Sequence, residues 1–120
     1  VFEPVFEYDE KEKIFLNSDC FLLPSKSENF GMSIVEALSY GVPVLTTEET
    51  PWKILKEINA GKIIKFSQDN LTSNLRDMLS MSSQDLLLMG LRGKKFLKDY
   101  YDIENIILDY IKFYEEVLRK

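Results

Sequence analysis

The sequence predicts an α/β protein in which helices flank a parallel sheet and a helical tail follows at the C-terminus. Up to Phe66, short apolar runs alternate with longer segments of helical periodicity, which is the pattern of βα units. Beyond Phe66 only helical periodicity remains. A chain of 120 residues, 45% hydrophobic and 29% charged, can bury a core of moderate size. Residues 1–120 are therefore expected to form a single domain.

Three apolar runs are the strand candidates, because each is short, rich in branched or aromatic residues and followed by a break in the pattern. They cover 20–24, 42–46 and 62–66. A weaker strand is expected over 1–6, where Pro4 would suit the edge of a sheet.

The segments around these runs have helical periodicity and cover 8–17, 32–40 and 52–58. Gly41 and Pro43 form a typical stop for the second of these helices. Thr50 is expected to cap the third, with Pro51 at its first position, and the segment 59–61 is expected to end it.

The tail is expected to hold helices over 70–81, 83–98 and 102–119. In the last helix an apolar stripe recurs at helical spacing. It consists of Ile103, Ile106, Ile107, Tyr110, Tyr114, Val117 and Leu118. Such a stripe must be covered, either by this sheet or by a missing domain.

Composition excludes several kinds of function. The chain has no histidine, so it has no histidine-based acid–base catalysis and no histidine-ligated metal. A net charge of −5 disfavours nucleic acid as a partner, because phosphates require a basic face. A single cysteine permits no internal disulfide and fits a reducing cytoplasm. No apolar run reaches the roughly 20 residues that span a bilayer, and no secretory signal opens the chain. It begins without Met, so a fragment is expected.

Glu28 and Glu36 are the most informative pair of residues. Glu28 lies in the loop after the strand over 20–24, and Glu36 lies in the helix over 32–40. Ligands bind α/β sheets at the carboxyl ends of strands, where a helix start offers free N–H groups to an anion. Two carboxylates there would suit a ligand with hydroxyls and phosphate, such as a nucleotide sugar. The alternatives are a capping box between Ser33 and Glu36 and a solvated Glu28.

Several short motifs surround Glu28 and Glu36, and together they resemble a known family signature. They are Pro24-Ser25 at a strand end, Phe30-Gly31 after Glu28, Glu36-Ala37, and Gly41-Val42-Pro43-Val44. The segment over 18–47 thereby resembles the E-x7-E signature of retaining, nucleotide-sugar-dependent group 1 glycosyltransferases of the GT-B fold. Asn29 departs from the glycine that many members have there, although asparagine tolerates a left-handed turn.

The resemblance implies a Rossmann-like fold that forms part of the C-terminal, donor-binding domain of such an enzyme. Glu28 would be the catalytic residue that contacts hydroxyls of the donor sugar, and Glu36 would hold the ribose. The other donor contacts would come from backbone amides near Phe30, Gly31, Met32 and Ser33. No metal or other cofactor is then expected, since the helix dipole favours the diphosphate leaving group.

The implied reaction moves a hexose from a nucleotide-diphosphate sugar to a glycan acceptor with retention, in polysaccharide or lipopolysaccharide biosynthesis. An N-terminal acceptor domain and the basic residues that neutralise the diphosphate would lie outside this chain, so the chain alone is expected to be inactive. The parent protein is expected in the cytoplasm, with peripheral association at the inner membrane face. A bare sheet edge could support a homodimer.

Two other functional interpretations remain open. The chain could be a non-catalytic module that binds a nucleotide or a partner, or a Rossmann-like fold without sugar chemistry. Among single residues, Cys20 is expected in the core, and Trp52 either lines a pocket or packs under the following loop. The cations at positions 26, 92, 94, 95 and 98 are expected to be solvated.

Overall fold

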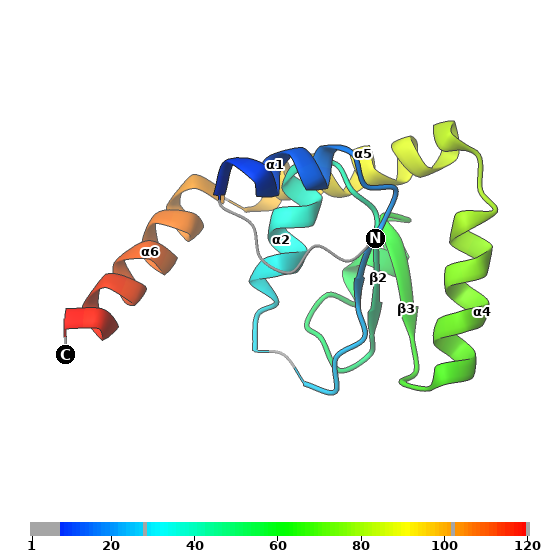
Figure 1. Ribbon diagram of the computed structural model, residues 1–120, viewed down its shortest axis with the longest axis horizontal. Helices are drawn as coiled ribbons and strands as arrows, with labels where there is room; N and C mark the ends of the chain where they lie inside the picture. Colours follow the sequence, from blue (N-terminus) through cyan, green and yellow to red (C-terminus); the bar gives the residue numbers. More distant parts are fainter. Residues whose placement is uncertain (1–7, 28, 102, 120) are drawn as a thin grey trace.

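The computed structural model describes residues 8–27, 29–101 and 103–119 (Figure 1). The elements are α1 (Tyr8–Leu16), β1 (Phe21–Leu23), α2 (Met32–Ser39), β2 (Val44–Thr47), α3 (Ile54–Glu57), β3 (Gly61–Ile64), α4 (Gln68–Leu79), α5 (Ser83–Tyr100) and α6 (Ile103–Arg119). Glu28 and the strand expected over 1–6 lie outside the described residues.

The strands form a parallel sheet in the order β1-β2-β3, as the sequence predicts. Phe21 aligns with Val44, and Val44 aligns in turn with Gly61. Helices link successive strands, so the α/β class with flanking helices is confirmed.

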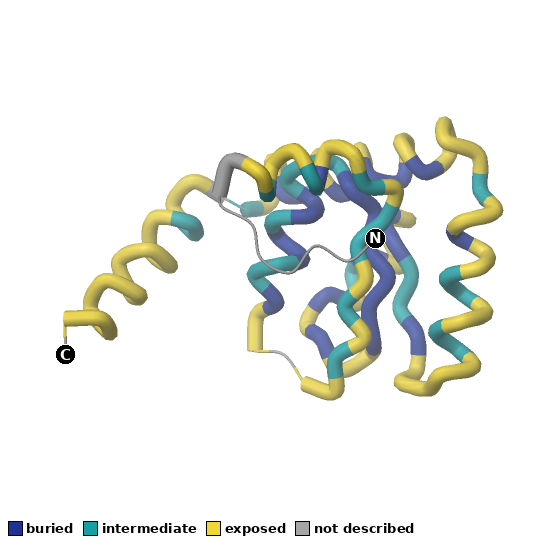
Figure 2. The backbone as a smooth tube through the Cα atoms, viewed as in Figure 1, coloured by how far each residue is buried: buried dark blue, intermediate teal, exposed yellow. Residues whose placement is uncertain are grey.

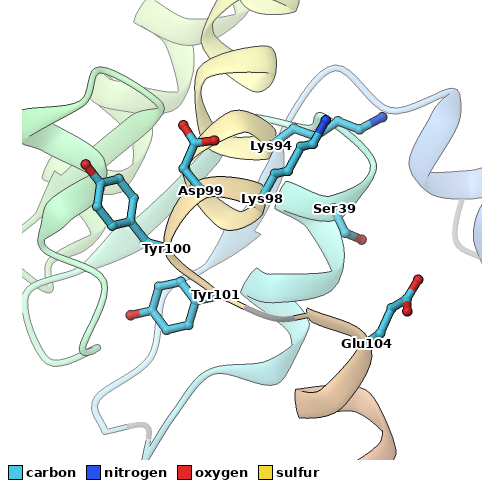
Figure 3. A pocket seen from close by; sticks show the side chains of 7 residues that line it. All are labelled: Ser39, Lys94, Lys98, Asp99, Tyr100, Tyr101 and Glu104. Atoms are coloured by element: carbon cyan, nitrogen blue, oxygen red, sulfur yellow. The ribbon is translucent and has the colours of Figure 1, made fainter.

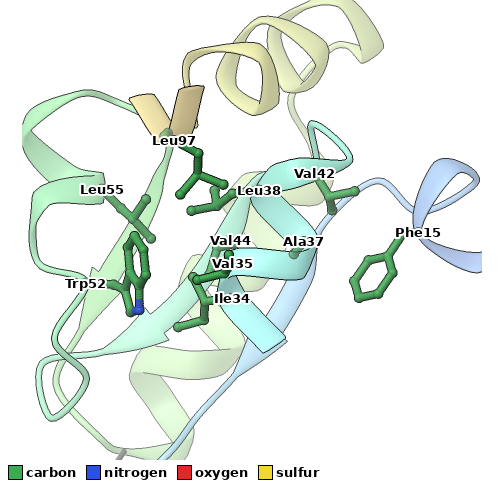
Figure 4. Packing of buried hydrophobic residues seen from close by; sticks show 11 residues of the cluster. Phe15, Ile34, Val35, Ala37, Leu38, Val42, Val44, Trp52, Leu55 and Leu97 are labelled. Atoms are coloured by element: carbon green, nitrogen blue, oxygen red, sulfur yellow. The ribbon is translucent and has the colours of Figure 1, made fainter. Parts of the chain in front are cut away.

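Both faces of the sheet are covered, because side chains alternate between faces along a strand. Val44 joins a cluster formed with α2, α3 and the C-terminal half of α5 (Figure 4). The next residue, Leu45, joins a second cluster, formed with α4 and the start of α5. Consequently β2 is buried along its whole length, and Figure 2 shows the buried backbone concentrated at the centre of the molecule.

The end of α2 confirms the stop expected at Gly41. Gly41 has a φ of 73°, and its N–H donates to the carbonyl of Leu38. The N–H of Val42 donates to the carbonyl of Ala37, which completes a Schellman motif. The chain then turns directly into β2.

The start expected for the third helix is wrong. Thr50 does not cap it, because its hydroxyl donates to the carbonyl of Thr47 at 3.1 Å. The helix, α3, begins only at Ile54, after the buried Trp52. Its end is as expected: Asn59 has a φ of 55°, and the N–H of Ala60 donates to the carbonyl of Leu55.

Helix α5 crosses very close to the turn between α2 and β2. A Cβ built at Gly90 would lie 1.8 Å from the carbonyl oxygen of Gly41. No side chain fits at that distance, so glycine at position 90 sets the depth to which α5 packs.

Helix α6 extends away from the body of the molecule (Figure 1). Its apolar stripe does not cover the sheet, since four of its members, Tyr110, Tyr114, Val117 and Leu118, are exposed, while Ile106 and Ile107 are half-buried. Three large apolar side chains outside the stripe, Leu108, Ile111 and Phe113, are exposed as well. In the described part of the chain, no helix is long and apolar enough to cross a membrane.

Candidate functional site

The candidate site lies where α2 begins, beside the carboxyl ends of the strands (Figure 1). Two hydroxyls of β2 fix the chain that leaves β1. Thr46 donates to the carbonyl of Leu23 at 2.8 Å, and Thr47 donates to the carbonyl of Ser25. Both threonines are buried. The backbone is therefore held by hydrogen bonds as far as Ser25, where the loop after β1 begins.

Trp52 fixes the other end of that loop. Its indole N–H donates to the carbonyl of Phe30 at 2.5 Å, and the two rings lie 5.7 Å apart. Gly31 follows at the N-cap of α2 with a φ of 76°. A Cβ there would meet Trp52 and Ile34 at 3.2–3.3 Å. Glycine is needed both for the positive φ and for the close indole.

Trp52 itself is only 2% exposed and belongs to the core, next to Leu55 in Figure 4. Of the two interpretations of Trp52, packing is confirmed, but the indole packs against the loop before α2, at Phe30 and Gly31, and not under the following loop. The indole contacts the start of α2 from the core side and does not line the site.

The structure places the predicted backbone ligands at this helix start. Gly31 is buried, Met32 and Ser33 are half-buried, and Phe30 is 38% exposed. The first N–H groups of a helix have no partner one turn earlier, so they are available to an anion. Glu28 lies outside the described residues, so its catalytic role stays a prediction.

Glu36 is not part of a capping box, so that alternative is wrong. The N-cap is Gly31 and not Ser33, which lies inside the first turn of α2. The Glu36 carboxylate instead forms an ion pair with Lys11 of α1, with 2.7 Å between Nζ and Oε2. The sequence pattern did not single out Lys11, because the contact joins two separate helices.

Lys11 and Glu36 line a cavity of about 280 Å³ between α1, α2 and α6. The remaining lining residues are Met32, Ser39, Tyr40, Ile107, Tyr110 and Ile111. Apolar and aromatic walls with a few polar groups are typical of a small-molecule site. Its volume lies just below the range of about 300–1,000 Å³ that is usual for such sites.

A larger, open hollow of about 650 Å³ lies at the junction of α2, α5 and α6 (Figure 3). It is lined by Ser39, Lys94, Lys98, Asp99, Tyr100, Tyr101 and Glu104. In Figure 3 the Lys94 and Lys98 side chains point away from Tyr101 and Glu104. The polar groups therefore do not converge on one point, and this hollow is a weaker candidate.

A third hollow, of about 230 Å³, opens at the carboxyl edge between β2, β3 and the start of α4. Its lining residues include Thr47, Ile64 and Phe66. The ammonium group of Lys26, an exposed residue, lies 5.4 Å from the centre of the Phe66 ring. A cation–π contact thus holds Lys26 beside this hollow.

The remaining expectations concern single residues outside the site. Cys20 packs against the second core cluster, and its burial, with Asp19 beside it, raises the pKa of its thiol. The cations of α5 are exposed as expected, and Lys95 pairs with Asp99 at 2.6 Å. Among the described residues, no cluster of Cys, Asp and Glu side chains could hold a metal ion.

A parallel sheet with a glycine-started helix at its carboxyl edge defines a Rossmann-like ligand-binding domain. Residues 4–89 match the family described as glycosyl transferases group 1. This match covers more than half of the chain, so the chain belongs to that family. The resemblance predicted from the segment over 18–47 is confirmed.

Curated relatives support this assignment. The O-antigen biosynthesis glycosyltransferase WclY of Escherichia coli is 26% identical over 112 residues, which cover 93% of this chain and 31% of WclY. The sulfoquinovosyl transferase SQD2 of Arabidopsis thaliana is 38% identical over 45 residues, or 38% of this chain and 9% of SQD2. The chain thus spans about a third of the length of WclY.

Solved structures agree. WaaG, a glycosyltransferase involved in lipopolysaccharide biosynthesis, superposes with a TM-score of 0.66 at 27% identity, over 80% of this chain and 26% of WaaG. Sucrose-phosphate synthase from Thermosynechococcus elongatus gives a TM-score of 0.78 at 16% identity, over 99% of this chain and 30% of the synthase. The second likeness shows the fold alone. The Rossmann-like GT-B fold is therefore confirmed.

Proposed function

We propose that this chain is the donor-binding part of a retaining glycosyltransferase that moves a hexose from a nucleotide-diphosphate sugar to a glycan acceptor. Membership of the group 1 family supports transfer chemistry. The names of WclY and WaaG, which refer to O-antigen and lipopolysaccharide biosynthesis, support a role in building a bacterial surface polysaccharide.

The observation that carries this proposal is the start of α2. Gly31 turns the chain so that the first N–H groups of the helix lie at the carboxyl edge of the sheet. A diphosphate there would be stabilised by the helix dipole, most strongly as charge develops on the leaving group. One turn further along, Glu36 borders a cavity and can accept hydrogen bonds from ribose hydroxyls.

In this proposal Glu28 contacts the donor sugar, and both carboxylates bind and orient the donor. Neither acts as a nucleophile. The leaving phosphate assists deprotonation of the acceptor on the same face of the sugar, which retains the anomeric configuration. No metal or other cofactor takes part.

The rest of the enzyme lies outside this chain in the proposal. Since the chain spans about a third of WclY, an N-terminal acceptor domain would complete the interdomain cleft. The protein works in the cytoplasm, at the inner face of the membrane. Within the described residues, β1 and β3 each pair on one side only, so upstream strands or a second copy would cover an open edge.

The test uses the intact protein encoded by the full reading frame, with UDP-glucose, UDP-galactose and GDP-mannose as donors. Donor consumption and glycan formation are measured for wild type, Glu28→Gln and Glu36→Gln. Glu57→Gln, at an exposed position at the end of α3, is the matched control. Each site variant should lower transfer roughly 10- to 150-fold, because a hydrogen bond to a charged group contributes about 1.5–3 kcal/mol. Glu57→Gln should match wild type.

Three further readouts separate the alternatives. The anomeric proton of the new linkage in NMR spectra should show the configuration of the donor, and inversion would contradict the proposal. Transfer should persist in EDTA if no metal takes part. Nucleotide binding without transfer to any acceptor would instead indicate a non-catalytic module.

A further inference from the structure

The contact between Lys11 and Glu36 is the feature that the proposed function does not yet explain. The two residues lie on different helices and are 25 positions apart in the sequence. Their charged atoms are 2.7 Å apart, within hydrogen-bonding distance. The side chains are 39% and 28% exposed, so the pair lies near the surface but is partly shielded from water.

This pair contributes little to folding. Ion pairs with such exposure typically stabilise a protein by about 0–1 kcal/mol. Helix α1 is already attached to the core by Phe15, which is buried against the rings of Phe21 and Tyr40. Stability alone therefore does not require a lysine at position 11.

The position of the pair suggests a different use. Lys11 and Glu36 line the same cavity, on the side formed by α1 and α2. An ionised carboxylate offers about four lone-pair sites on its two oxygens. The ammonium group at Oε2 therefore leaves capacity for hydroxyl groups of a ligand in the cavity, while it restricts the rotation of the Glu36 side chain.

Charge leads to the same conclusion. A nucleoside diphosphate is an anion, and it would approach a chain of net charge −5. An uncompensated carboxylate next to the binding position would repel it. A lysine in contact with that carboxylate offsets the negative charge without removing the acceptor oxygens.

We propose that Lys11 is a positioning residue that holds the Glu36 carboxylate ready for the ribose hydroxyls of the nucleotide donor. This inference rests on the proposed function, because it assumes that Glu36 binds the nucleoside part. Lys11 acts through Glu36: it fixes the acceptor before binding, so that less conformational freedom is lost when the nucleotide arrives.

The experiment is a double-mutant cycle in the intact protein, with UDP and GDP as the probes. Dissociation constants are measured by calorimetry for wild type, Lys11→Met, Glu36→Gln and the double variant. Lys11→Arg tests rescue by a cation of similar reach. Lys13→Met, an exposed lysine on the same helix, is the matched control. Thermal unfolding of each variant reports any structural effect.

Lys11→Met should weaken binding of the preferred nucleotide roughly 3- to 10-fold, which corresponds to ordering one or two mobile side chains. In the Glu36→Gln background the same change should have a clearly smaller effect, since the glutamine amide keeps an acceptor oxygen for Lys11 but no negative charge for it to offset. The dissociation constant of Lys11→Arg should stay within about twofold of the wild-type value, and that of Lys13→Met should equal the wild-type value. The KM for the donor sugar should rise more than kcat falls. All variants should unfold within about 3 °C of one another.

Three outcomes would overturn the role of Lys11. Tighter binding by Lys11→Met would show that the lysine blocks the carboxylate. An equal loss in the wild-type and Glu36→Gln backgrounds would show that Lys11 acts independently of Glu36. The proposed function is tested separately: if Glu36→Gln alone leaves nucleotide binding unchanged, Glu36 does not hold the ribose. If Glu36→Gln weakens binding but Lys11→Met does not, only the role of Lys11 is wrong.

Discussion

Replacing Gly31 with alanine should be clearly more damaging than making the same change at Gly41. Both glycines have a positive φ, 76° and 73°, and both lie at an end of α2. Their surroundings differ. A Cβ at Gly41 would meet only Lys94 Cδ, at 4.0 Å, whereas a Cβ at Gly31 would lie 3.2 Å from the Trp52 indole nitrogen and 3.3 Å from Ile34.

The magnitudes follow from these contacts. A left-handed conformation costs a non-glycine residue about 1–2 kcal/mol. Gly41→Ala should therefore lower the free energy of unfolding by about 1 kcal/mol. Gly31→Ala has the same cost, and in addition the Trp52 ring must yield. Moving the ring weakens its hydrogen bond to the Phe30 carbonyl, which is worth about another 1 kcal/mol. The total for Gly31→Ala is about 2–3 kcal/mol.

Urea unfolding of the two variants, followed by tryptophan fluorescence, measures the difference directly. Trp52 is the only tryptophan in the chain, so the signal also reports the environment of the indole that must move. Nucleotide affinity should fall in Gly31→Ala and stay unchanged in Gly41→Ala, because only the former lies at the predicted donor site. Equal losses of stability in the two variants would refute the idea that Trp52 constrains the turn.

Three further predictions concern packing and titration. Gly90→Ala should lower the free energy of unfolding by about 2 kcal/mol or more, because its Cβ would overlap the Gly41 carbonyl oxygen; thermal unfolding within 2 °C of wild type would contradict this. Trp52→Phe should cost about 2–3 kcal/mol in urea unfolding, since a buried ring shrinks and the Phe30 carbonyl loses its donor; a cost below about 1 kcal/mol would show that the contact is dispensable. Burial raises the pKa of the Cys20 thiol above its ordinary value of 9.0, so the unfolded chain loses that proton at lower pH than the folded chain does. The free energy of unfolding should therefore fall as pH rises above about 9. The decline between pH 8 and pH 10 should be smaller in Cys20→Ala, and identical declines would contradict the shift.

The sheet could be predicted from the sequence because the information is local. Each strand is a short apolar run that ends at a polar or turn residue, and burial on both faces of a parallel sheet requires such runs. The exact limits differ by a few residues: the run over 42–46 becomes Val44–Thr47, because pairing with β3 starts only at Gly61. Helix ends that depend on a positive φ, such as Gly41, were also predictable.

Two local patterns suggested wrong helix caps. Ser33 to Glu36 has the spacing of a capping box, but α2 begins at Met32, as expected for the helix over 32–40, and its N-cap is Gly31. Thr50 with Pro51 has the pattern of a helix start, but burial of Trp52 delays α3 to Ile54. In both places a tertiary contact of Trp52 lies next to the predicted cap, and this contact joins segments 22 positions apart.

The contact that matters most for the site was not predictable from local patterns. Lys11 lies among alternating charges in α1, where a solvated side chain is the usual outcome. Its pairing with Glu36 depends on how α1 packs across α2, which is determined by the buried Phe15 and not by the charges. The family signature predicted a role for Glu36, whereas its partner Lys11 was identified only from the structure.

The geometry of α2 links the stability of the domain to its proposed activity. Four of its eight residues, Ile34, Val35, Ala37 and Leu38, are buried in the core cluster that also contains Trp52. Glu36 lies between them in the sequence and faces Lys11 and the cavity. A helix with one face fixed in the core can hold the carboxylate on its other face in a constant position. Substitutions that loosen this core should therefore weaken donor binding before they unfold the chain, because the carboxylate loses its position while the sheet is still intact.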